Sequence, residues 1–426
     1  MAAGMPAGSA EPRVGAREAA TGERADVRRV PYPYRAMLAI CSDLDETPDR
    51  GVYAETMRFL NTTSPTSMGP GVGLEIGNTI YFDMPPSQFA YWNTDDAGRQ
   101  MLRDLMRSGH VDCLHSFGDL ATTRAHAERA LDELAAHGCA LRVWVDHAVA
   151  PTNFGSDIMR GQGDVPGSAA YHADLTIAAG VRYVWRGRVT SVIGQSVPRS
   201  LGRLCRLDHP VGSLTTIAKE AAKGALGRAG SPKYRMHAAN DVLQPVQLRD
   251  GLRTQEFLRA NPHWAGVNVG ETAGGLAEVL TDAFIEHLCA SGGVCVLYTH
   301  LGKVSDPAQP LPAGSRAALR RLARAAAERR ILVTTTRRLL DFCHAERTAT
   351  IFRTAGAEAD RVDVRTTAAG LAATELQGLT VYVANDRAVR VFVDGDERTA
   401  IACNPPDETG RASITIPWTP LTFPPA

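Results

Sequence analysis

In this 426-residue chain, four apolar runs are each followed within a few residues by acidic residues or histidines. The runs and the groups that follow them are 37–40 before Asp43 and Asp45, 111–114 before His115 and Asp119, 141–145 before Asp146 and His147, and 294–298 before His300. In a barrel of parallel strands, the carboxyl ends of the strands meet at one mouth, where groups far apart in sequence can share a metal ion or a substrate. The pattern therefore predicts an enzyme.

Two of these groups have the residue types that bind a divalent metal. His115 and Asp119 are four residues apart and can meet on one ion if the chain makes a single turn after its strand. Asp43 or Asp45 would complete the set and leave a position open for water, and the other aspartate could act as base on that water. An alternative for Asp119 is that it caps a helix that begins near residue 122.

His300 ends an almost continuously apolar run of the kind found in buried parallel strands. A histidine there would face the mouth, and a pKa near neutrality would suit it to protonate a leaving amine. The alternative is a histidine that only forms hydrogen bonds with the backbone.

Five further residues are candidates for contacting a substrate. Asp146 and His147 lead into a turn-forming run that contains Asn153, and they could bind substrate hydroxyls or orient a catalytic partner. A turn stabilised by its own carboxylate would explain Asp146 equally well. Trp185 and Arg186 end another strand and could supply an aromatic platform and an anion-pairing group, although a buried core tryptophan is the alternative.

Strand-like and helix-like segments alternate from residue 34 to residue 347, as in repeated βα units. The expected helices are 122–137, 171–179, 276–290 and 315–330, and each is followed by a strand. This order favours an α/β fold with a parallel barrel over a sandwich. Residues 348–426 alternate apolar and polar positions with a period of two, which predicts a small antiparallel β domain with an accessory role.

Two stretches of the expected barrel domain are irregular. Residues 62–96 contain several turn-forming Gly and Pro residues, and residues 187–235 mix Gly, Pro and basic residues around an expected helix at 215–225. Long insertions of this kind often serve as lids or binding loops, so we expect substrate recognition there. Solvated surface decoration is an equal alternative for residues 187–235.

Composition sets limits on partners and location. Lys and Arg together number 46, as do Asp and Glu, so the balanced charge gives no reason to expect nucleic acid as a partner, and a small-molecule or oligosaccharide substrate fits better. The eight cysteines are scattered without a C-x-x-C pair, which indicates a reducing compartment. Residues 1–33 read as a disordered tail without a signal peptide, and no run is long enough to span a membrane. We therefore expect a cytoplasmic protein without a membrane partner, and the pattern leaves the oligomeric state open.

The order of these motifs resembles that of the polysaccharide deacetylase family of carbohydrate esterases. In that family one motif pairs a base aspartate with a metal-binding aspartate, and the segment 42–48 is similar to it. A second motif, His-Ser/Thr-x-x-His, is similar to 115–119, and a late apolar strand that ends in the general-acid histidine is matched by 297–300. The departures are Leu44 between the two acids, Asp119 in place of the usual second histidine, and Asp146-His147 where the family has Arg-x-Pro.

The resemblance implies a distorted TIM-like (β/α) barrel over residues 34–347 and a divalent metal ion, Zn²⁺ or similar. It implies Asp43 as the base, His300 as the general acid, and Asp45, His115 and Asp119 as metal ligands. The resulting hypothesis is a metal-dependent hydrolase that removes an N-acyl group, such as acetyl, from a sugar or a sugar-containing metabolite. Two alternatives are a glycoside hydrolase that uses Asp43 and Asp146 as its two carboxylates and a catalytically inactive carbohydrate-binding relative.

Overall fold

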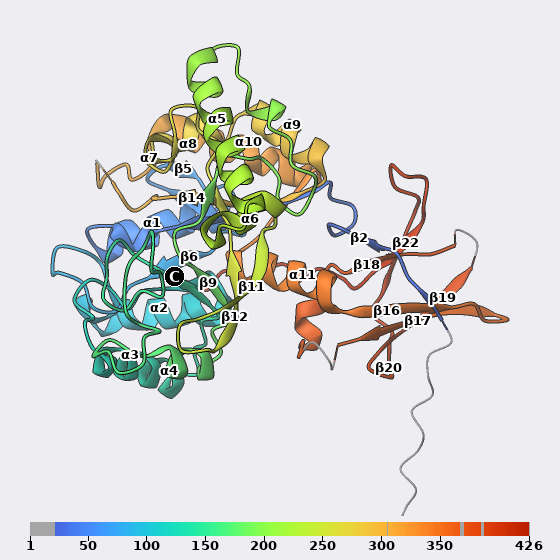
Figure 1. Cartoon of the computed structure of the whole chain (residues 1–426), viewed down its shortest axis with the longest axis horizontal. Coiled ribbons are helices and arrows are strands. Elements are labelled where there is room, and N and C mark those ends of the chain that lie inside the picture. Colours follow the sequence, from blue (N-terminus) through green and yellow to red (C-terminus); the bar gives the residue numbers. More distant parts are fainter. Residues whose placement is uncertain (1–21, 305, 367–369, 385–386, 426) are drawn as a thin grey trace, which may run out of the picture.

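A large, mostly parallel sheet organises the larger of two bodies in the computed structural model (Figure 1). The structure describes residues 22–304, 306–366, 370–384 and 387–425, with the side chain of Asp45 excluded. The strands of this sheet are β3 (Ala36–Ser42), β6 (Asn78–Ile80), β7 (Val111–His115), β8 (Val143–Val145), β9 (Tyr183–Trp185), β10 (Val189–Thr190), β11 (Leu243–Gln247), β12 (Arg253–Phe257), β13 (Arg259–Ala260), β14 (Val294–Thr299) and β15 (Ile331–Val333). Their order is β10-β13-β14-β3-β6-β7-β8-β9-β12-β11, and β15 also pairs with β3.

The expected distorted TIM-like (β/α) barrel is wrong, because the path of hydrogen-bonded strands is open and ends at β10 and β11. The break lies at β12. One edge of β12 pairs in parallel with β9, and the other edge is filled by the antiparallel strand β11. The ladder therefore cannot continue from β12 to another parallel strand, and the result is a strongly curled mixed α/β sheet.

Helices follow most strands, and they pack around the curled sheet (Figure 1), except that the last of them packs its Leu339, Leu340 and Phe342 against the concave interior. They are α1 (Arg50–Asn61), α2 (Asp96–Ser108), α3 (Arg124–Ala136), α4 (Ala173–Ala178), α5 (Pro210–Arg228), α6 (Arg235–Ala239), α7 (Val267–Gly270), α8 (Leu276–Val279), α9 (Asp282–Ser291), α10 (Ala313–Ala327) and α11 (Thr336–Thr348). The expected helices at 122–137, 171–179 and 315–330 are confirmed as α3, α4 and α10. The expected helix at 276–290 is split into α8 and α9, because Thr281 accepts a hydrogen bond from the backbone of Phe284 and so starts a new helix. Within the described ranges, every helix is too short or too polar to cross a bilayer.

Strand β3 lies at the centre of the sheet, and all seven of its residues are buried. Because side chains alternate along a strand, Met37, Ala39 and Cys41 point into the concave interior, while Leu38 and Ile40 pack under the surrounding helices. Strand β14 pairs with β3 in parallel over six consecutive residue pairs that end at Thr299 and Ser42. The two strands therefore stop at the same level.

The smaller body contains two sheets rather than one antiparallel domain (Figure 1). Its strands are β16 (Thr350–Thr354), β17 (Ala359–Arg365), β18 (Thr380–Tyr382), β19 (Ala388–Val393), β20 (Asp396–Arg398), β21 (Ala402–Asn404) and β22 (Ser413–Thr415). The expectation of a purely antiparallel domain is wrong, since β17 and β19 are parallel neighbours. The reason is that the chain passes through β18 of the other sheet between them and does not form a hairpin.

The amino-terminal segment contributes to the smaller body. Residues 1–21 of the expected disordered tail lie outside the described residues, but β1 (Glu23–Arg24) pairs with β16 and β2 (Val27–Arg28) pairs with β18. The buried Arg28 donates a hydrogen bond to the carbonyl of Val30 at 3.1 Å and forms an ion pair with Asp407 at 3.0 Å. The smaller body is thus built from segments near both ends of the sequence.

One buried carboxylate connects the two bodies. Glu375 is 2% exposed and receives the guanidinium groups of Arg142 and Arg182, which directly precede β8 and β9. Arg182 Nη1 lies 3.0 Å from both oxygens of Glu375. The chain then returns to the larger body, where the ring of Phe423 meets the ring of His110 at a centroid distance of 5.0 Å.

We expect Glu375→Ala to lower the free energy of unfolding by about 2 kcal/mol, because the change leaves two partly buried guanidinium groups without their carboxylate. Urea unfolding followed by circular dichroism would measure the loss. The matched control is Glu397→Ala, which removes an exposed ion pair with Arg390 and should leave the free energy of unfolding nearly unchanged, because solvent screens the pair. Equal losses in the two variants would contradict this role of Glu375.

Candidate functional site

Three of the candidate residues meet at the carboxyl ends of neighbouring strands. Asp43 follows β3, His115 ends β7 and His300 follows β14, and their exposed fractions are 2%, 1% and 6%. The period of two along each strand places Asp43 on the same face as Cys41, His115 on the same face as Cys113, and His300 on the same face as Tyr298. These neighbours line the concave interior, so the strands aim all three side chains into one space.

The common end of β3 and β14 holds Asp43 and His300 together. The amide of Asp43 donates to the carbonyl of Thr299 at 3.2 Å, and the amide of Leu301 donates to Ser42 Oγ at 3.0 Å. His300 Nε2 lies 3.1 Å from Asp43 Oδ2. Gly302 is needed next to this pair, because a Cβ at that position would lie 2.6 Å from the carbonyl oxygen of Asp43.

The carboxylate of Asp43 is ionised although it is buried. Burial alone would raise its pKa, but His115, Arg259 and His300 together hold the pKa well below its usual range. Arg259 Nη2 lies 3.7 Å from Asp43 Oδ1, and His115 Nε2 lies 4.0 Å from the same oxygen. Burial lowers the pKa of His115 to about 4, so at neutral pH His115 is uncharged and the permanent positive charge near Asp43 is that of Arg259.

His300 is suited to carry a proton. Burial favours its neutral form, but the charge of Asp43 and the hydrogen bond to Asp43 outweigh burial and raise the pKa of His300 above its ordinary value. Its backbone amide donates to the carbonyl of Glu271 at 2.5 Å, and its Nδ1 lies 3.9 Å from Glu271 Oε2. The ring is therefore fixed between two acidic residues.

Arg259 is a site residue that the sequence analysis missed. It is fully buried in β13, its guanidinium carbon lies 4.0 Å from the ring centroid of Trp185 and 5.1 Å from that of Tyr298, and its Nη2 lies 2.9 Å from Cys41 Sγ. Such a cation is costly to bury without a negative partner, and Asp43 is that partner. The sequence feature that could have identified Arg259 is its position as the single charged residue within the otherwise apolar run 257–260.

Asp119 does not lie against His115. Ser116, Phe117 and Gly118 have positive φ angles of 48°, 61° and 103°, so the chain makes a left-handed turn in place of the expected helical one. Asp119 Oδ1 instead lies 3.4 Å from His147 Nε2. The alternative of a helix cap is also wrong, since Thr123 occupies the cap position of α3.

Tyr81 connects the two histidines of this region and was also missed. Its hydroxyl lies 2.6 Å from His147 Nδ1 and 3.4 Å from His115 Nε2, and its ring stacks on His115 at a centroid distance of 4.1 Å. Its position directly after the short strand β6 was the only signal in the sequence. His115, Tyr81, His147 and Asp119 thus form a continuous polar row that runs outward from the Asp43 pair.

Asp146 and Asn153 hold the loop after β8. Asp146 is 1% exposed and accepts hydrogen bonds from Trp144 Nε1 at 2.6 Å and from the amides of Phe154 at 2.9 Å and Gly155 at 2.7 Å. Burial outweighs these hydrogen bonds and raises the pKa of Asp146 to about 7. Asn153 is fully buried and accepts from the amide of His147, so both predicted substrate contacts are occupied with the loop itself.

Trp185 and Arg186 are likewise occupied inside the protein. Trp185 is 1% exposed, its Nε1 donates to the carbonyl of Arg188 at 2.8 Å, and Arg259 covers one face of its ring. Arg186 forms a two-pronged ion pair with Glu256 at 2.9 and 3.0 Å. The open aromatic platform expected for a sugar ring is absent at Trp185, because the ring is packed in the interior.

The described side chains supply only some of the ligands that a divalent metal ion would require. No three His, Cys, Asp or Glu side chains among them are grouped as ligands of one ion, and Asp45, an expected ligand, lies outside the described side chains. Asp43 Oδ1 is buried without a hydrogen-bond partner and faces the neutral His115. A buried, ionised oxygen opposite a neutral imidazole fits a cation.

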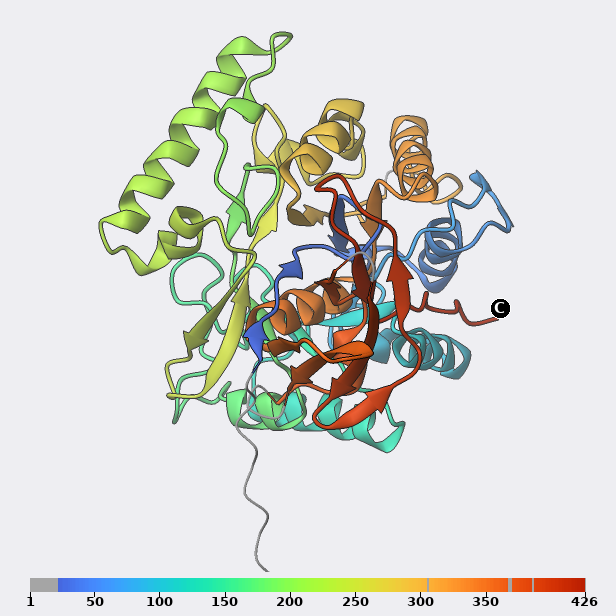
Figure 2. The ribbon, with the colours of Figure 1, turned by 90° about the vertical axis from the view of Figure 1, so that its right-hand side faces the viewer.

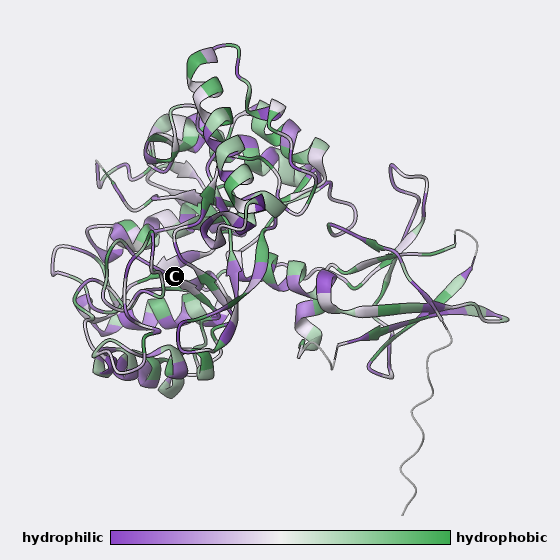
Figure 3. Cartoon of the chain, in the orientation of Figure 1, coloured by the Kyte–Doolittle hydropathy of each residue, from purple (hydrophilic) through white to green (hydrophobic). Residues whose placement is uncertain are grey.

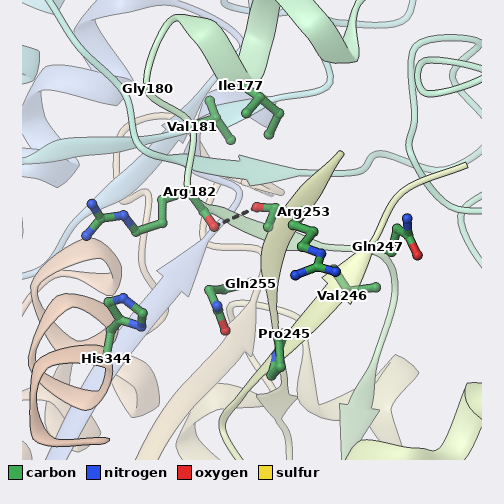
Figure 4. Close-up of a pocket in the computed structure, with 11 residues that line it drawn as sticks. Ile177, Gly180, Val181, Arg182, Pro245, Val246, Gln247, Arg253, Gln255 and His344 are labelled. Atoms are coloured by element: carbon green, nitrogen blue, oxygen red, sulfur yellow. Dashed lines mark hydrogen bonds between the residues drawn. The ribbon is translucent and has the colours of Figure 1, made fainter. Parts of the chain in front are cut away.

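A cavity of about 630 Å³ lies away from these residues (Figure 4). It is bounded by the end of α4, the residues that precede β9, the β11–β12 hairpin and His344 of α11. Thr254 Oγ1 donates to the carbonyl of Arg182 at 2.7 Å across its wall. Since Arg182 precedes its strand, this cavity is at the amino ends of the strands, opposite Asp43 and His300.

Comparisons with protein-family models, with curated proteins and with solved structures found no match to this chain. The resemblance to polysaccharide deacetylases therefore stays a prediction.

A buried histidine behind the site makes stability depend on pH. His172 Nε2 lies 2.8 Å from the carbonyl oxygen of Thr152, in the loop that Asp146 and Asn153 hold, and its Nδ1 lies 2.7 Å from Thr176 Oγ1. Burial lowers the pKa of His172 to about 4. The unfolded chain, with an ordinary histidine pKa, therefore takes up this proton first as the pH falls.

We expect the stability that His172 contributes to be fully present above about pH 6.5 and to be lost as the pH falls toward 4, with a slope of up to about 1.4 kcal/mol per pH unit. His172→Phe keeps an aromatic ring against Trp144 and Phe154 and should flatten this slope. Urea unfolding at several pH values would measure it. The control is the partly exposed His137→Gln, and an unchanged slope in His172→Phe would contradict the assignment.

Proposed function

We propose that this chain is a metal-dependent hydrolase of the deacetylase type, which removes an N-acyl group, such as acetyl, from a sugar or a sugar-containing metabolite. The observation that carries the proposal is the pair of Asp43 and His300, an ionised carboxylate 3.1 Å from a histidine whose pKa is raised. Hydrolysis of an amide needs one group that accepts a proton from water and one that gives a proton to the departing amine. The two residues supply both.

In the proposed reaction, Asp43 accepts a proton from the water whose oxygen bonds to the acyl carbon. His300 donates its proton to the amide nitrogen as the C–N bond breaks, and the amine leaves. The proton on Asp43 then returns to His300 across the distance between them, which restores both groups. Atoms and charges balance, because one water is consumed and one acid and one amine are released.

Arg259 acts in this scheme through Asp43. Its buried charge keeps the carboxylate ionised, and the rings of Trp185 and Tyr298 hold the guanidinium in place. Because its guanidinium contacts Asp43, Cys41 and two aromatic rings in the interior, we regard Arg259 as a positioning residue.

A divalent ion, Zn²⁺ or similar, would be held by His115 with Asp45, and when bound it would polarise the acyl carbonyl and acidify water. Asp119, the third expected ligand, lies against His147 instead and is not part of this proposal. His115 supports this proposal because its lowered pKa keeps it neutral, which is the form that binds metals. The proposed setting is the cytoplasm, in line with the scattered cysteines of the sequence.

The alternative of a glycoside hydrolase has less support. It requires Asp146 as the second carboxylate, and both oxygens of Asp146 are committed to hydrogen bonds with Trp144, Phe154 and Gly155. An inactive carbohydrate-binding relative would have no need to keep an ionised carboxylate next to a histidine with a raised pKa in its interior.

We expect Asp43→Asn and His300→Gln each to lower turnover about 10²- to 10⁴-fold, the range that general acid–base groups contribute. Acetate release from a panel of N-acetylated amino sugars and their oligomers would measure the rates, and circular dichroism would confirm folding. Asp132→Asn, on the exposed side of α3, is the matched control. Release of reducing sugar in place of acetate would assign the glycosidase, and no turnover of any kind by the native protein would contradict an enzyme of either class.

We expect His115→Ala and Asp45→Ala to lower the amount of divalent metal that copurifies with the protein, because each removes a proposed ligand. Elemental analysis by mass spectrometry after dialysis would measure the metal content per chain. His287→Ala on α9 is the control for loss of a histidine outside the site. Equal metal content in all four proteins would contradict the proposed ligands.

A further inference from the structure

Helix α5 presents an apolar face to solvent. It is the outermost helix of the larger body, yellow-green at the upper left of Figure 2, and several of its residues are coloured as hydrophobic in Figure 3. Val211 is 76% exposed and Leu214 65%, and Leu207, just before the helix, is 92% exposed. Ala218, Ala222 and Ala225 continue this face along the helix and are exposed too. The face is thus a long apolar stripe without a partner in the described chain.

The polar side of α5 is the buried side. Glu220 is 1% exposed and accepts hydrogen bonds from Thr190 Oγ1 at 2.8 Å and from the amide of Ser191 at 3.0 Å. It also forms an ion pair with Lys223 at 2.7 Å. Rotation of the helix would break these buried contacts, so the apolar stripe cannot turn inward.

The first turn of α5 is fixed as well. The ring of His209 stacks on Trp264 at a centroid distance of 3.8 Å, with an angle of 5° between the planes. A Cβ on Gly212 would lie 2.9 Å from the same tryptophan, so the helix approaches Trp264 closely. The stripe is therefore a rigid feature of the folded protein.

Charge around the stripe is strongly positive. Residues 199–235 contain eight Lys and Arg residues but only two acidic residues, whereas the whole chain is balanced. Both acids are already engaged, Asp208 with Arg206 and Glu220 with Lys223. The exposed Lys219 and Arg228 lie on the helix itself. An apolar stripe flanked by basic residues is typical of helices that lie in the interface of an anionic membrane.

We propose that α5 docks the protein on the surface of an anionic lipid bilayer, with Leu207, Val211 and Leu214 in the interface and the basic residues near the headgroups. The charge favours this occupant over a second copy of the chain, because two such surfaces would repel each other. A helix that lies in the interface does not cross the membrane. The proposal departs from the expectation of no membrane partner, and it is independent of the chemistry at Asp43 and His300.

Cosedimentation with vesicles tests the proposal on the full chain. One set of vesicles contains phosphatidylcholine and phosphatidylglycerol in a ratio of three to one, and a second contains phosphatidylcholine alone. We expect binding to the anionic vesicles that weakens with added salt, and at least tenfold weaker binding to the neutral ones. Val211→Asp/Leu214→Asp and Lys219→Gln/Arg228→Gln should each weaken binding to the anionic vesicles about tenfold or more.

The replaced side chains are exposed, so both variants should fold, and thermal unfolding would verify this. The control is Arg324→Gln, which removes an exposed basic residue from α10 and should bind like the native protein. Three results would overturn the proposal. The first is no binding of the native protein to anionic vesicles, and the second is binding by both α5 variants that equals that of the native protein. The third is binding of the native protein to neutral vesicles that equals its binding to anionic ones. A native dimer that Val211→Asp/Leu214→Asp converts to a monomer, without vesicle binding, would assign the stripe to a second copy.

Discussion

The parallel register of β3 and β14 is the constraint on which the site depends. Both strands end at the same level, at Ser42 and Thr299, so the next residue of each, Asp43 and His300, meets the other. A slip of one residue along either strand would turn its side chains to the opposite face and separate the pair. The fully buried strands resist such a slip, because it would turn the helix-facing Leu38, Ile40 and Leu297 into the concave interior and turn interior residues such as Met37 and Tyr298 toward the helices.

The site also depends on how its buried charges are compensated. Four ionisable groups from different strands, Asp43, His115, Arg259 and His300, share a space from which water is largely excluded, and this arrangement is stable only if their charges compensate. Arg259 balances Asp43 and rests between two aromatic rings, while His115 avoids the problem by staying neutral. The polar row through Tyr81 and His147 then leads from this interior toward the more exposed Asp119.

The sequence predicted the parts of the structure that local patterns determine. Apolar runs followed by His or Asp located the strand ends, and helical periodicity located α3, α4 and α10. The closed barrel failed because the antiparallel strand β11 fills an edge of β12, a long-range pairing that periodicity does not reveal. Asp119 was placed wrongly beside His115 because consecutive left-handed residues at Ser116 and Phe117, which are rare outside glycine, reverse the turn.

The roles of buried polar and aromatic residues were the hardest to predict from the sequence. Trp185 and Asn153 have side chains that suit a substrate, but packing and loop hydrogen bonds use them instead. Arg259 was missed for the opposite reason, since a charged residue within an apolar run looks like an irregularity until its partner Asp43, more than two hundred positions earlier, is brought beside it. Such partners are fixed by the tertiary fold rather than by spacing.

The two-ended origin of the smaller body has a consequence for synthesis on the ribosome. The strands β1 and β2 leave the ribosome early, but their partners β16 and β18 follow more than three hundred residues later. Until then, β1 and β2 have no partner strands, and the larger body folds while the smaller body is still incomplete. The smaller body therefore cannot close until β22, which pairs with β18, has been synthesised.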